Sequence, residues 1–403
     1  QSKYGCGVRE FVFLLDLQEC GYEVDIFAEG ALGASSAAQR LPLHRRFGWS
    51  APLAVEAFET VRWFNQTEAL DLERYTNIFF FGWYSEFREF ERRGGSERTS
   101  ALLPKLQPFR SRTTLMLDDV PDVRCEDEQT FRRSASFCGA LVRHAVAQWA
   151  AAAKQVFTLT DSDAEQVTDM LGRYGLSESG PVRVWPLRLR HLVSLQQEEQ
   201  LSVGLDIGPG DLLPEGRRYL TMVANDHAAN RNFTEHLFSS GAVQRWCEKL
   251  VPLMFVGTIS SYVNELRRSH PGMPDDCIIT AGVQSRAVLA QRIFPRTLAI
   301  LNPFWKDLRS GISVKSYEAL AAGIPLVTSV HGLRGLESCG VSELALGTKE
   351  AGDADAYVDF VERLLLDEHN YGLLTVETRG FLRACTEEQE AASPVANSCA
   401  ALE

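Results

Sequence analysis

The stretch from residue 298 to residue 336 constrains the fold more than any other part of the chain. It contains an apolar segment at 298–302, a polar loop at 304–311, a helical pattern at 313–322, a second apolar segment at 325–330 and a Gly-x-x-Gly loop. Gly323 stands where the helix would end, and Pro325 prevents its continuation. Two apolar strands joined through a helix are typical of parallel strands covered on both faces. The sequence therefore predicts an α/β fold.

Lys315 stands in the first turn of this predicted helix, where the helix dipole disfavours a cation by about 0.3–1 kcal/mol. A bound anion would reverse that effect. The helix start follows the carboxyl end of a parallel strand, where open α/β sheets bind ligands and where free N–H groups accept phosphate. Glu318 follows on the same helix face and could accept hydrogen bonds from sugar hydroxyls. The alternative, a solvated Lys–Glu pair on an amphipathic helix, stays open at this point.

The composition excludes several classes of protein. With 403 residues, of which 45% are hydrophobic, the chain is long enough for two domains that each have a core. The net charge of −12 argues against a general partner among nucleic acids or anionic membranes, because both require a basic surface. No apolar segment reaches the roughly 18 residues of a spanning helix. We therefore expect no transmembrane segment, while a peripheral membrane contact stays open.

The nine cysteines are scattered, odd in number and without a C-x-x-C pair. This pattern predicts neither a zinc site nor a disulfide framework, and it favours a reducing, cytoplasmic location. The sequence has two glycosylation sequons, at Asn65 and Asn232. They carry little weight because no signal peptide precedes them.

The N-terminal segment begins with Gly5 and Gly7, followed by a helical pattern at 8–20 and an alternating strand at 22–28. A glycine loop and a helix normally follow an earlier strand. We therefore expect that the first strand and a few N-terminal residues are missing from this sequence.

Two carboxylates, Asp118 and Asp119, follow a predicted strand at 113–117. Carboxylates at the end of a strand could hold an acceptor hydroxyl, act as a base or bind a divalent ion. They could equally cap a turn before Pro121, and both readings stay open.

A second acidic motif, Asp161-Ser162-Asp163, has the D-x-D form of some metal sites. Ser162 and Glu165 also match a capping box at the start of a helix that extends to residue 171. We favour the capping interpretation, and we predict no metal site.

The pattern of elements divides the chain into five parts. They are a first α/β domain at 1–190, a linker at 191–217, a second α/β domain at 218–366, a C-terminal helix at 367–386 and a disordered tail at 387–403. The linker is predicted from its Gln, Glu, Gly and Pro content and its lack of sustained periodicity. The tail is small and polar.

The second domain carries the motif G-x-x-x-K-x-x-E-A-L-A-x-G-x-P-x-V-T-x-x-x-G-x-x-G-L, from Gly311 to Leu336. Together with two successive α/β halves, this motif resembles the GT-B fold glycosyltransferases of the large family 4 / group 1. The resemblance is strongest over 219–336 and weaker over 5–27 and 113–186. It implies a GT-B architecture, in which two Rossmann-like domains with parallel sheets face a central cleft.

The resemblance also implies roles for individual residues. Gly5 and Gly7 would lie near the donor diphosphate and the acceptor, Gly282 and Val283 would border the nucleotide base, and Glu318 would bind the ribose. The diphosphate would lie near Gly311 and Lys315, and residues 330–336 would close the pocket. Asn230, Arg231 and Arg309 are further candidates for donor binding.

Two positions depart from the pattern of many relatives. Ser310 stands where these carry a first glutamate, eight residues before Glu318. Pro121 stands where they often have a histidine, and the segment around Asn230 and Arg231 matches a different branch.

The implied reaction is transfer of a sugar, in the manner of a hexosyltransferase, from a nucleoside-diphosphate sugar to an acceptor hydroxyl, with retention. Lys315, together with Arg231 or Arg309, would stabilise the leaving diphosphate, and Asp118 or Asp119 would orient or deprotonate the acceptor. No tightly bound cofactor and no metal is expected, and the acceptor could be a glycan, a lipid or a small molecule. The alternatives are a catalytically silent nucleotide-sugar or carbohydrate-binding protein and a nucleotide-sugar epimerase.

Overall fold

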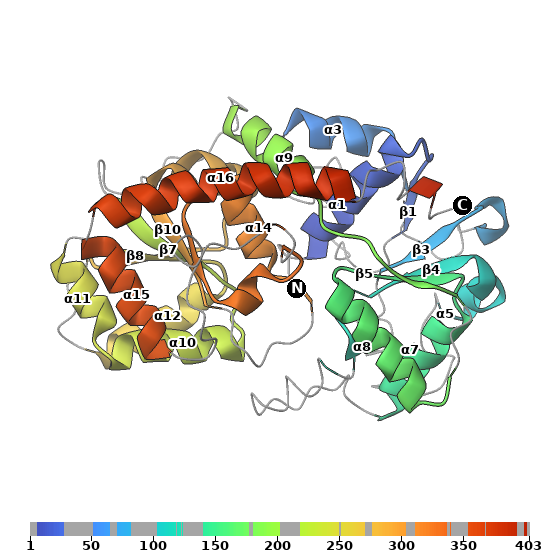
Figure 1. Cartoon of the computed structure of the whole chain (residues 1–403), viewed down its shortest axis with the longest axis horizontal. Helices are drawn as coiled ribbons and strands as arrows, with labels where there is room; N and C mark the ends of the chain where they lie inside the picture. Colours follow the sequence, from blue (N-terminus) through green and yellow to red (C-terminus); the bar gives the residue numbers. More distant parts are fainter. Residues whose placement is uncertain are drawn as a thin grey trace.

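The structure is a computed structural model of the chain. It describes residues 6–27, 51–64, 71–81, 103–117, 119–121, 123, 140–176, 180–201, 218–249, 251–270, 276–303, 311–336, 339, 354–366, 368–392 and 399–400. Two α/β bodies lie side by side, and the last long helix, α16 (Glu368–Ala392), runs across both of them (Figure 1).

The first domain contains a sheet of four parallel strands in the order β3-β4-β5-β6 and a separate parallel pair, β1-β2. The strands are β1 Asp25–Phe27, β2 Arg62–Phe64, β3 Ile78–Phe80, β4 Thr113–Met116, β5 Gln155–Thr158 and β6 Val182–Val184. The helices are α1 Cys6–Glu19, α3 Pro52–Glu59, η3 Leu72–Arg74, α5 Leu103–Leu106, η5 Gln107–Arg112, α7 Ala140–Ala152 and α8 Asp161–Arg173. All residues of β4 and β5 are buried, as expected for strands covered on both faces.

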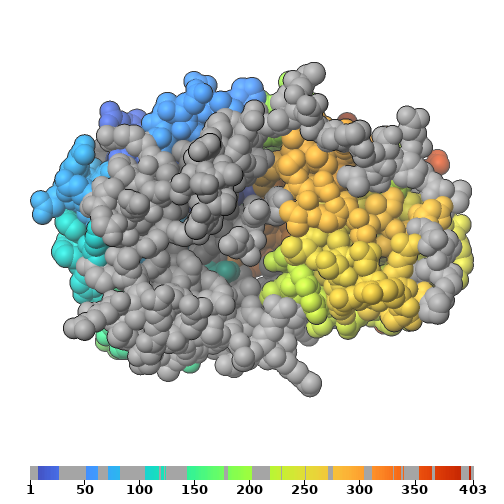
Figure 2. Space-filling model, turned by 180° about the vertical axis from the view of Figure 1, so that it is seen from behind, coloured from blue at the N-terminus to red at the C-terminus, as the bar shows by residue number. Residues whose placement is uncertain are grey.

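The second domain contains five parallel strands in the order β11-β10-β7-β8-β9. They are β7 Tyr219–Val223, β8 Leu253–Val256, β9 Ile278–Gly282, β10 Thr297–Asn302 and β11 Leu326–Thr328. The helices are α10 Ala228–Ser239, α11 Ala242–Glu248, α12 Ile259–Ser269, α13 Arg286–Val288, η7 Leu289–Ile293, η8 Phe294–Arg296, α14 Val314–Ala321, η9 Val330–Leu333 and α15 Ala354–Leu366. In the view from behind, this domain (yellow to orange) forms one side of the molecule (Figure 2). The predicted pair of parallel-sheet α/β domains is confirmed.

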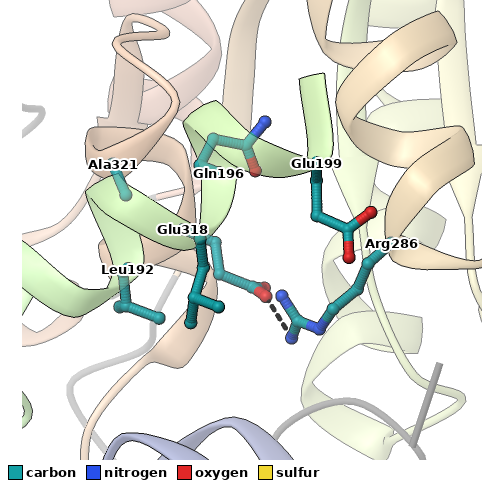
Figure 3. Close-up of a pocket in the computed structure, with 7 residues that line it drawn as sticks. Leu192, Gln196, Glu199, Arg286, Glu318 and Ala321 are labelled. Atoms are coloured by element: carbon teal, nitrogen blue, oxygen red, sulfur yellow. Dashed lines mark ion pairs between the residues drawn. The ribbon is translucent and has the colours of Figure 1, made fainter. Parts of the chain in front are cut away.

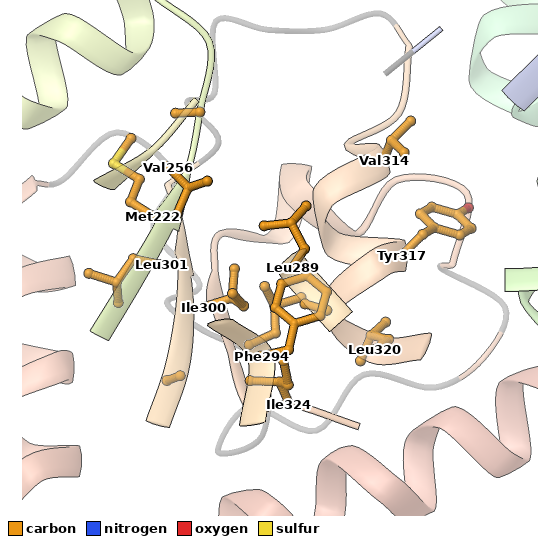
Figure 4. Close-up of a cluster of buried hydrophobic side chains, with 14 of the residues drawn as sticks. Met222, Val256, Leu289, Phe294, Ile300, Leu301, Val314, Tyr317, Leu320 and Ile324 are labelled. Atoms are coloured by element: carbon orange, nitrogen blue, oxygen red, sulfur yellow. The ribbon is translucent and has the colours of Figure 1, made fainter. Parts of the chain in front are cut away.

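A cluster of apolar side chains fixes the position of α14 against the sheet. Leu289, Phe294, Ile300, Leu320 and Ile324 gather into one cluster (Figure 4), and each is at most 8% exposed. Burial of large apolar side chains stabilises a fold by about 1.5–3 kcal/mol each. Helix α14 is therefore packed against a rigid part of the core, which fixes the position of its first turn.

The segment that connects the two domains, residues 185–201, is called the crossover. It differs from the predicted linker. Residues 191–201 belong to a helix, α9 (Leu189–Leu201), whereas the rest of the predicted linker, 202–217, lies outside the described residues. Leu189, Leu192 and Leu195 are buried at a spacing of three residues, so they form an apolar stripe. The Gln and Glu residues at 196–200, which suggested a linker, are good helix formers and continue the helix beyond these leucines.

The C-terminal region is also more helical than predicted. The predicted helix at 367–386 continues to Ala392, so residues 387–392 of the predicted disordered tail are helical. Gln389 shows why, because its side chain is buried against the crossover. It accepts a hydrogen bond from Leu189 N at 3.1 Å and donates one to Leu187 O at 3.4 Å.

The prediction that the cysteines form no disulfide framework is wrong. Disulfides join Cys20 to Cys399, Cys247 to Cys277 and Cys339 to Cys385. Their partners are 379, 30 and 46 residues apart, so the linear spacing of the cysteines contains no sign of them.

The helix cap of α8 lies two residues earlier than predicted. Thr160, not Ser162, is the N-cap, and its Oγ1 accepts a hydrogen bond from Asp163 N at 3.0 Å. Ser162 Oγ instead accepts a bond from Gln166 Nε2 at 3.3 Å.

Over the described ranges, no helix combines the length and the apolar character that a bilayer crossing requires.

A buried carboxylate on α1, Asp16, ties the first domain to the crossover. Its side chain is fully buried. Asp16 Oδ2 accepts a bond from Trp185 Nε1 at 2.7 Å, and Oδ1 lies 3.1 Å from Arg188 Nε and 2.9 Å from His191 Nε2. Arg190, in the same segment, pairs with Glu390 of α16 at 3.0 Å. Helix α1, the crossover and the end of α16 therefore meet at one place.

Asp16→Ala should destabilise the protein strongly, because it leaves the buried Arg188 cation and the Trp185 N–H without their acceptor. We expect a loss of about 3–5 kcal/mol in the free energy of unfolding, measured by urea denaturation. Glu19→Ala is the control on the same helix, since Glu19 is an exposed partner of Arg190 and should cost at most about 1 kcal/mol. Equal losses in the two variants would contradict a central role for Asp16.

Candidate functional site

The carboxyl edges of the two sheets meet in the region of the predicted site. Asp163 follows β5 of the first domain, whereas Gly311 and Arg334 follow β10 and β11 of the second. Asp163 Oδ1 accepts hydrogen bonds from Arg334 Nη2 at 2.8 Å and from Gly311 N at 3.3 Å. Because open α/β sheets bind ligands at these edges, the meeting point is a natural site for a substrate.

The corner between β10 and α14 is fixed by Asn302, the last residue of β10. Its buried amide nitrogen donates to Ser313 Oγ at 2.6 Å and to Ser316 Oγ at 2.8 Å. Its carbonyl oxygen accepts a bond from Thr328 Oγ1 of β11 at 2.6 Å. These bonds join both strands to the first turn of α14 and fix the direction in which that helix begins.

Lys315 lies in this first turn and is half-buried. Within the described ranges, no hydrogen bond or ion pair engages its ammonium, and the first turn contains no acidic residue. Burial lowers the pKa of Lys315 from 10.5 to about 8, against the opposing attraction of Glu318. A buried cation at the positive end of a helix attracts an anion strongly.

Glu318 does not form a solvated pair with Lys315. Its Oε1 lies 2.5 Å from Arg286 Nη2, and the two side chains are only 16% and 13% exposed. Figure 3 shows this ion pair at a small pocket where Gln196 and Glu199 of α9 face the same space. The carboxylate predicted to bind ribose is therefore held in a fixed orientation.

The end of β9 provides the surface predicted to border the base. Gly282 has a φ of 64°, which favours glycine, and Val283 is 48% exposed although it is apolar. Arg286 follows three residues later and reaches Glu318. The structure thus brings the β9 exit and α14 together, as the resemblance implies.

Asn230 and Arg231, in the first turn of α10, are engaged by local partners. Arg231 Nη2 lies 2.6 Å from Asp226 Oδ2, and its guanidinium lies 4.5 Å from the centre of the Tyr262 ring. Asn230 Nδ2 donates to Asn225 Oδ1 at 2.8 Å. The hydrogen bond from Arg231 to Asp226 raises the pKa of Arg231, so this cation is already compensated.

The first domain supplies less of the predicted site. Asp119 is partly buried beyond β4, while Asp118 lies outside the described residues, as do Gly5 and Arg309. Gly7 lies in the first turn of α1 and not in a loop before it. The first-turn N–H groups of a helix have no partner within the helix, so a role for Gly7 near a phosphate stays a prediction.

Sequence reasoning missed three residues of this site. Asp163 is fully buried against Arg334, although the capping interpretation assigned it only a local role. Burial raises the pKa of the Asp163 carboxyl, and Arg334 opposes that shift. The D-x-D form was the signal available for Asp163, and Arg334 lies in the range 330–336 that was expected to close the pocket, although no role was assigned to it; nothing in the sequence marks Arg286.

Neither a family model nor a curated protein matches the sequence. Solved structures do match. The sucrose-phosphate synthase (tll1590) of Thermosynechococcus elongatus has a TM-score of 0.58 at 16% identity, covering 96% of this chain and 90% of its own. Anabaena Alr3699/HepE in complex with UDP-glucose has a TM-score of 0.55 at 12% identity, covering 100% and 98%.

A third match is the α,α-trehalose 6-phosphate synthase of Burkholderia multivorans, with a TM-score of 0.51 at 15% identity over 84% of this chain and 75% of its own. The chain has the GT-B fold. At these identities the similarity establishes the architecture alone.

Lys315→Met should stabilise the protein in the absence of ligand. The folded state of the wild type releases the Lys315 proton near pH 8 and the unfolded state near pH 10.5. The penalty for burying the charge is therefore complete below about pH 8 and disappears as the pH rises to 10.5. We expect the variant to gain about 1–3 kcal/mol at pH 7 in urea denaturation, and this gain should shrink over that window. A gain that does not change with pH would contradict a buried, unpaired ammonium.

Proposed function

We propose that the chain is a glycosyltransferase that moves a sugar from a nucleoside-diphosphate sugar to an acceptor hydroxyl. One observation carries the proposal: the half-buried Lys315, at the start of α14 in a GT-B fold, has no hydrogen-bond or ion-pair partner in the described part of the chain. Support also comes from the matching Alr3699/HepE, whose structure contains UDP-glucose. We further propose the family 4 / group 1 subtype, a hexosyl donor and retention of configuration.

In this proposal the donor diphosphate lies against Lys315 and the free N–H groups of the first turn of α14. A preorganised cation stabilises the negative charge that develops on the leaving diphosphate. Glu318 accepts hydrogen bonds from the ribose, in the orientation that Arg286 gives it, and the base lies beside Gly282 and Val283. No step requires a tightly bound cofactor or metal.

Asp119, with its neighbour Asp118, orients or deprotonates the acceptor hydroxyl. Asp119 lies on the first domain, beyond β4, whose carboxyl edge adjoins that of the second domain through Asp163. The acceptor can be a glycan, a lipid or a small molecule. Gly7 of α1 and Gly5 before it belong to the same side of the cleft in this proposal.

The remaining donor-binding candidates take smaller roles. Arg231 binds the diphosphate only if its guanidinium leaves Asp226 and pairs with a phosphate. Asn230 takes part only if its side-chain amide leaves Asn225. Gly311 supports the loop before α14, in which Arg309 is a further candidate for the phosphates. Lys315 is thus the main cation of the site.

A catalytically silent nucleotide-sugar or carbohydrate-binding protein is the second candidate. Ser310 and Pro121 favour it, because they stand where many relatives have a glutamate and a histidine. A nucleotide-sugar epimerase is a third reading, and the same assay separates all three.

The test is incubation of the purified protein with a panel of nucleoside-diphosphate sugars, with and without acceptor sugars and lipids. Release of nucleoside diphosphate with appearance of a glycosylated acceptor supports the transferase. Binding without turnover supports the silent protein, and conversion of the donor sugar without release of diphosphate supports the epimerase. Lys315→Met is the control, since it should abolish turnover while the fold is retained.

Glu318→Gln should weaken the binding of a nucleoside diphosphate by about 1–3 kcal/mol, the value of a hydrogen bond to a charged group. The physical reason is the loss of the carboxylate that accepts bonds from the ribose hydroxyls. Titration calorimetry with the same nucleotide in its 2′,3′-dideoxy form is the control, because the variant should lose little affinity for it. Equal losses for both nucleotides would remove Glu318 from the ribose site.

The disulfides bear on where this protein works. The cytoplasmic expectation depended on the absence of disulfides, and among the described cysteines three pairs are bonded. Disulfides form and persist mainly in oxidising compartments. We therefore propose an oxidising compartment as the place where the chain folds.

A further inference from the structure

Asp163 is a buried carboxylate with more partners than its helix requires. Thr160 already caps α8, and Thr160 Oγ1 donates back to Asp163 Oδ2 at 2.9 Å. The other carboxylate oxygen, Oδ1, faces the second domain and accepts bonds from Arg334 Nη2 and Gly311 N. Oδ2 therefore interacts with the N-cap of α8, and Oδ1 makes the contact between the two domains.

Near Asp163, the backbone of the loop after β11 lies very close to α14 and to the first domain. Gly335 has a φ of 81°, and a Cβ atom on it would lie 2.4 Å from Tyr317 Oη and 3.4 Å from Thr160 Cγ2. Tyr317 belongs to α14 and Thr160 to the first domain. Only a residue without a side chain lets the loop after β11 fit between them.

The contact joins the exits of three strands. Asp163 follows β5, Gly311 precedes α14 and Arg334 follows β11, so the contact spans both sheet edges at which the proposed substrates lie. Arg334 and Asp163 are 7% and 0% exposed. Such burial exists only while the two domains are together.

We propose that Asp163 is a latch that holds the two domains in their closed arrangement through Arg334 and the N–H of Gly311. In the closed state both charges are desolvated and paired. When the domains part, water solvates both charges again, which offsets much of the Coulomb energy lost. The latch therefore opens and closes readily, as a cleft that admits and releases substrates requires.

The latch makes Asp163 a positioning residue for the proposed site. By binding the N–H of Gly311, it fixes the residue that leads into α14, four positions before Lys315. By binding Arg334, it fixes the loop after β11. This inference depends on the contacts alone and not on the transferase activity.

The test measures the distance between the domains in solution. Fluorescent labels on unnatural amino acids are placed at Gln148 on α7 and at Lys249 beside α11, both of which are exposed. Asp163→Asn is compared with Asp161→Asn, which removes an exposed carboxylate from the same turn. We expect Asp163→Asn to lengthen and broaden the distance distribution, while Asp161→Asn matches the wild type. Identical distributions in all three proteins would overturn the latch.

Asp163→Asn leaves the Arg334 cation buried without its partner and could prevent folding. The double variant Asp163→Asn with Arg334→Gln removes both charges, so it should fold and still show the longer distance. Gly335→Ala provides a third route, because it keeps both charges and blocks the close approach. Unchanged distances in folded double and Gly335→Ala variants would overturn the latch as well.

An enzymatic readout separates positioning from a merely structural role. If the chain transfers sugar, Asp163→Asn should raise severalfold the share of donor that is hydrolysed instead of transferred, because an open cleft admits water. Asp161→Asn should leave this share unchanged. The distance measurement needs no activity, so failure of the proposed function would leave the latch test readable.

Discussion

The amide side chain of Asn302 is the interaction on which the rest of the site depends. It lies at the end of β10 and is buried, where an unsatisfied amide would cost about 1–3 kcal/mol. Ser313 and Ser316 accept its hydrogens, and the backbone carbonyl of the same residue accepts a hydrogen bond from the Thr328 hydroxyl. Two strands and one helix are thereby aligned at a single residue. The apolar cluster below holds α14 from one side, and Asn302 sets where its first turn points.

The sequence was sufficient for the parts of the fold that local physics decides. Strand β10 is a short apolar segment bounded by polar turns, and its predicted limits, 298–302, agree with the structure to within one residue. Helix α14 was predicted because Gly323 and Pro325 mark its end. Lys315 and Glu318 attracted attention for the same reason, since their positions relative to a helix start follow from spacing alone.

The rest of the fold and of the site depends on contacts between residues that are far apart in the sequence. Hydrophobic periodicity carries no information about such contacts. Asp163 and Arg334 are 171 residues apart, and Glu318 meets Arg286 although β9 and β10, the strands that precede these two residues, are not neighbours in the sheet. The same limit applies to α9. Its leucines can be identified as a buried helix face only when the fold shows that α14 and α16 cover them. Asp163 stands in the first turn of α8 and contacts the other domain, and the sequence shows only the first of these two facts.

Helix α16 runs across both domains, and disulfides anchor the chain near it at two places. Cys385 joins it to Cys339 of the second domain, and Cys399 beyond its end joins Cys20 at the end of α1. The segment from Cys20 to Cys399 is therefore closed into a covalent ring, and the two bonded cysteines are 379 positions apart in the sequence. A protease that cuts a surface loop between them leaves one molecule, held together without any noncovalent contact. These two disulfides keep both domains covalently attached to the segment around α16 even when the cleft between the domains opens.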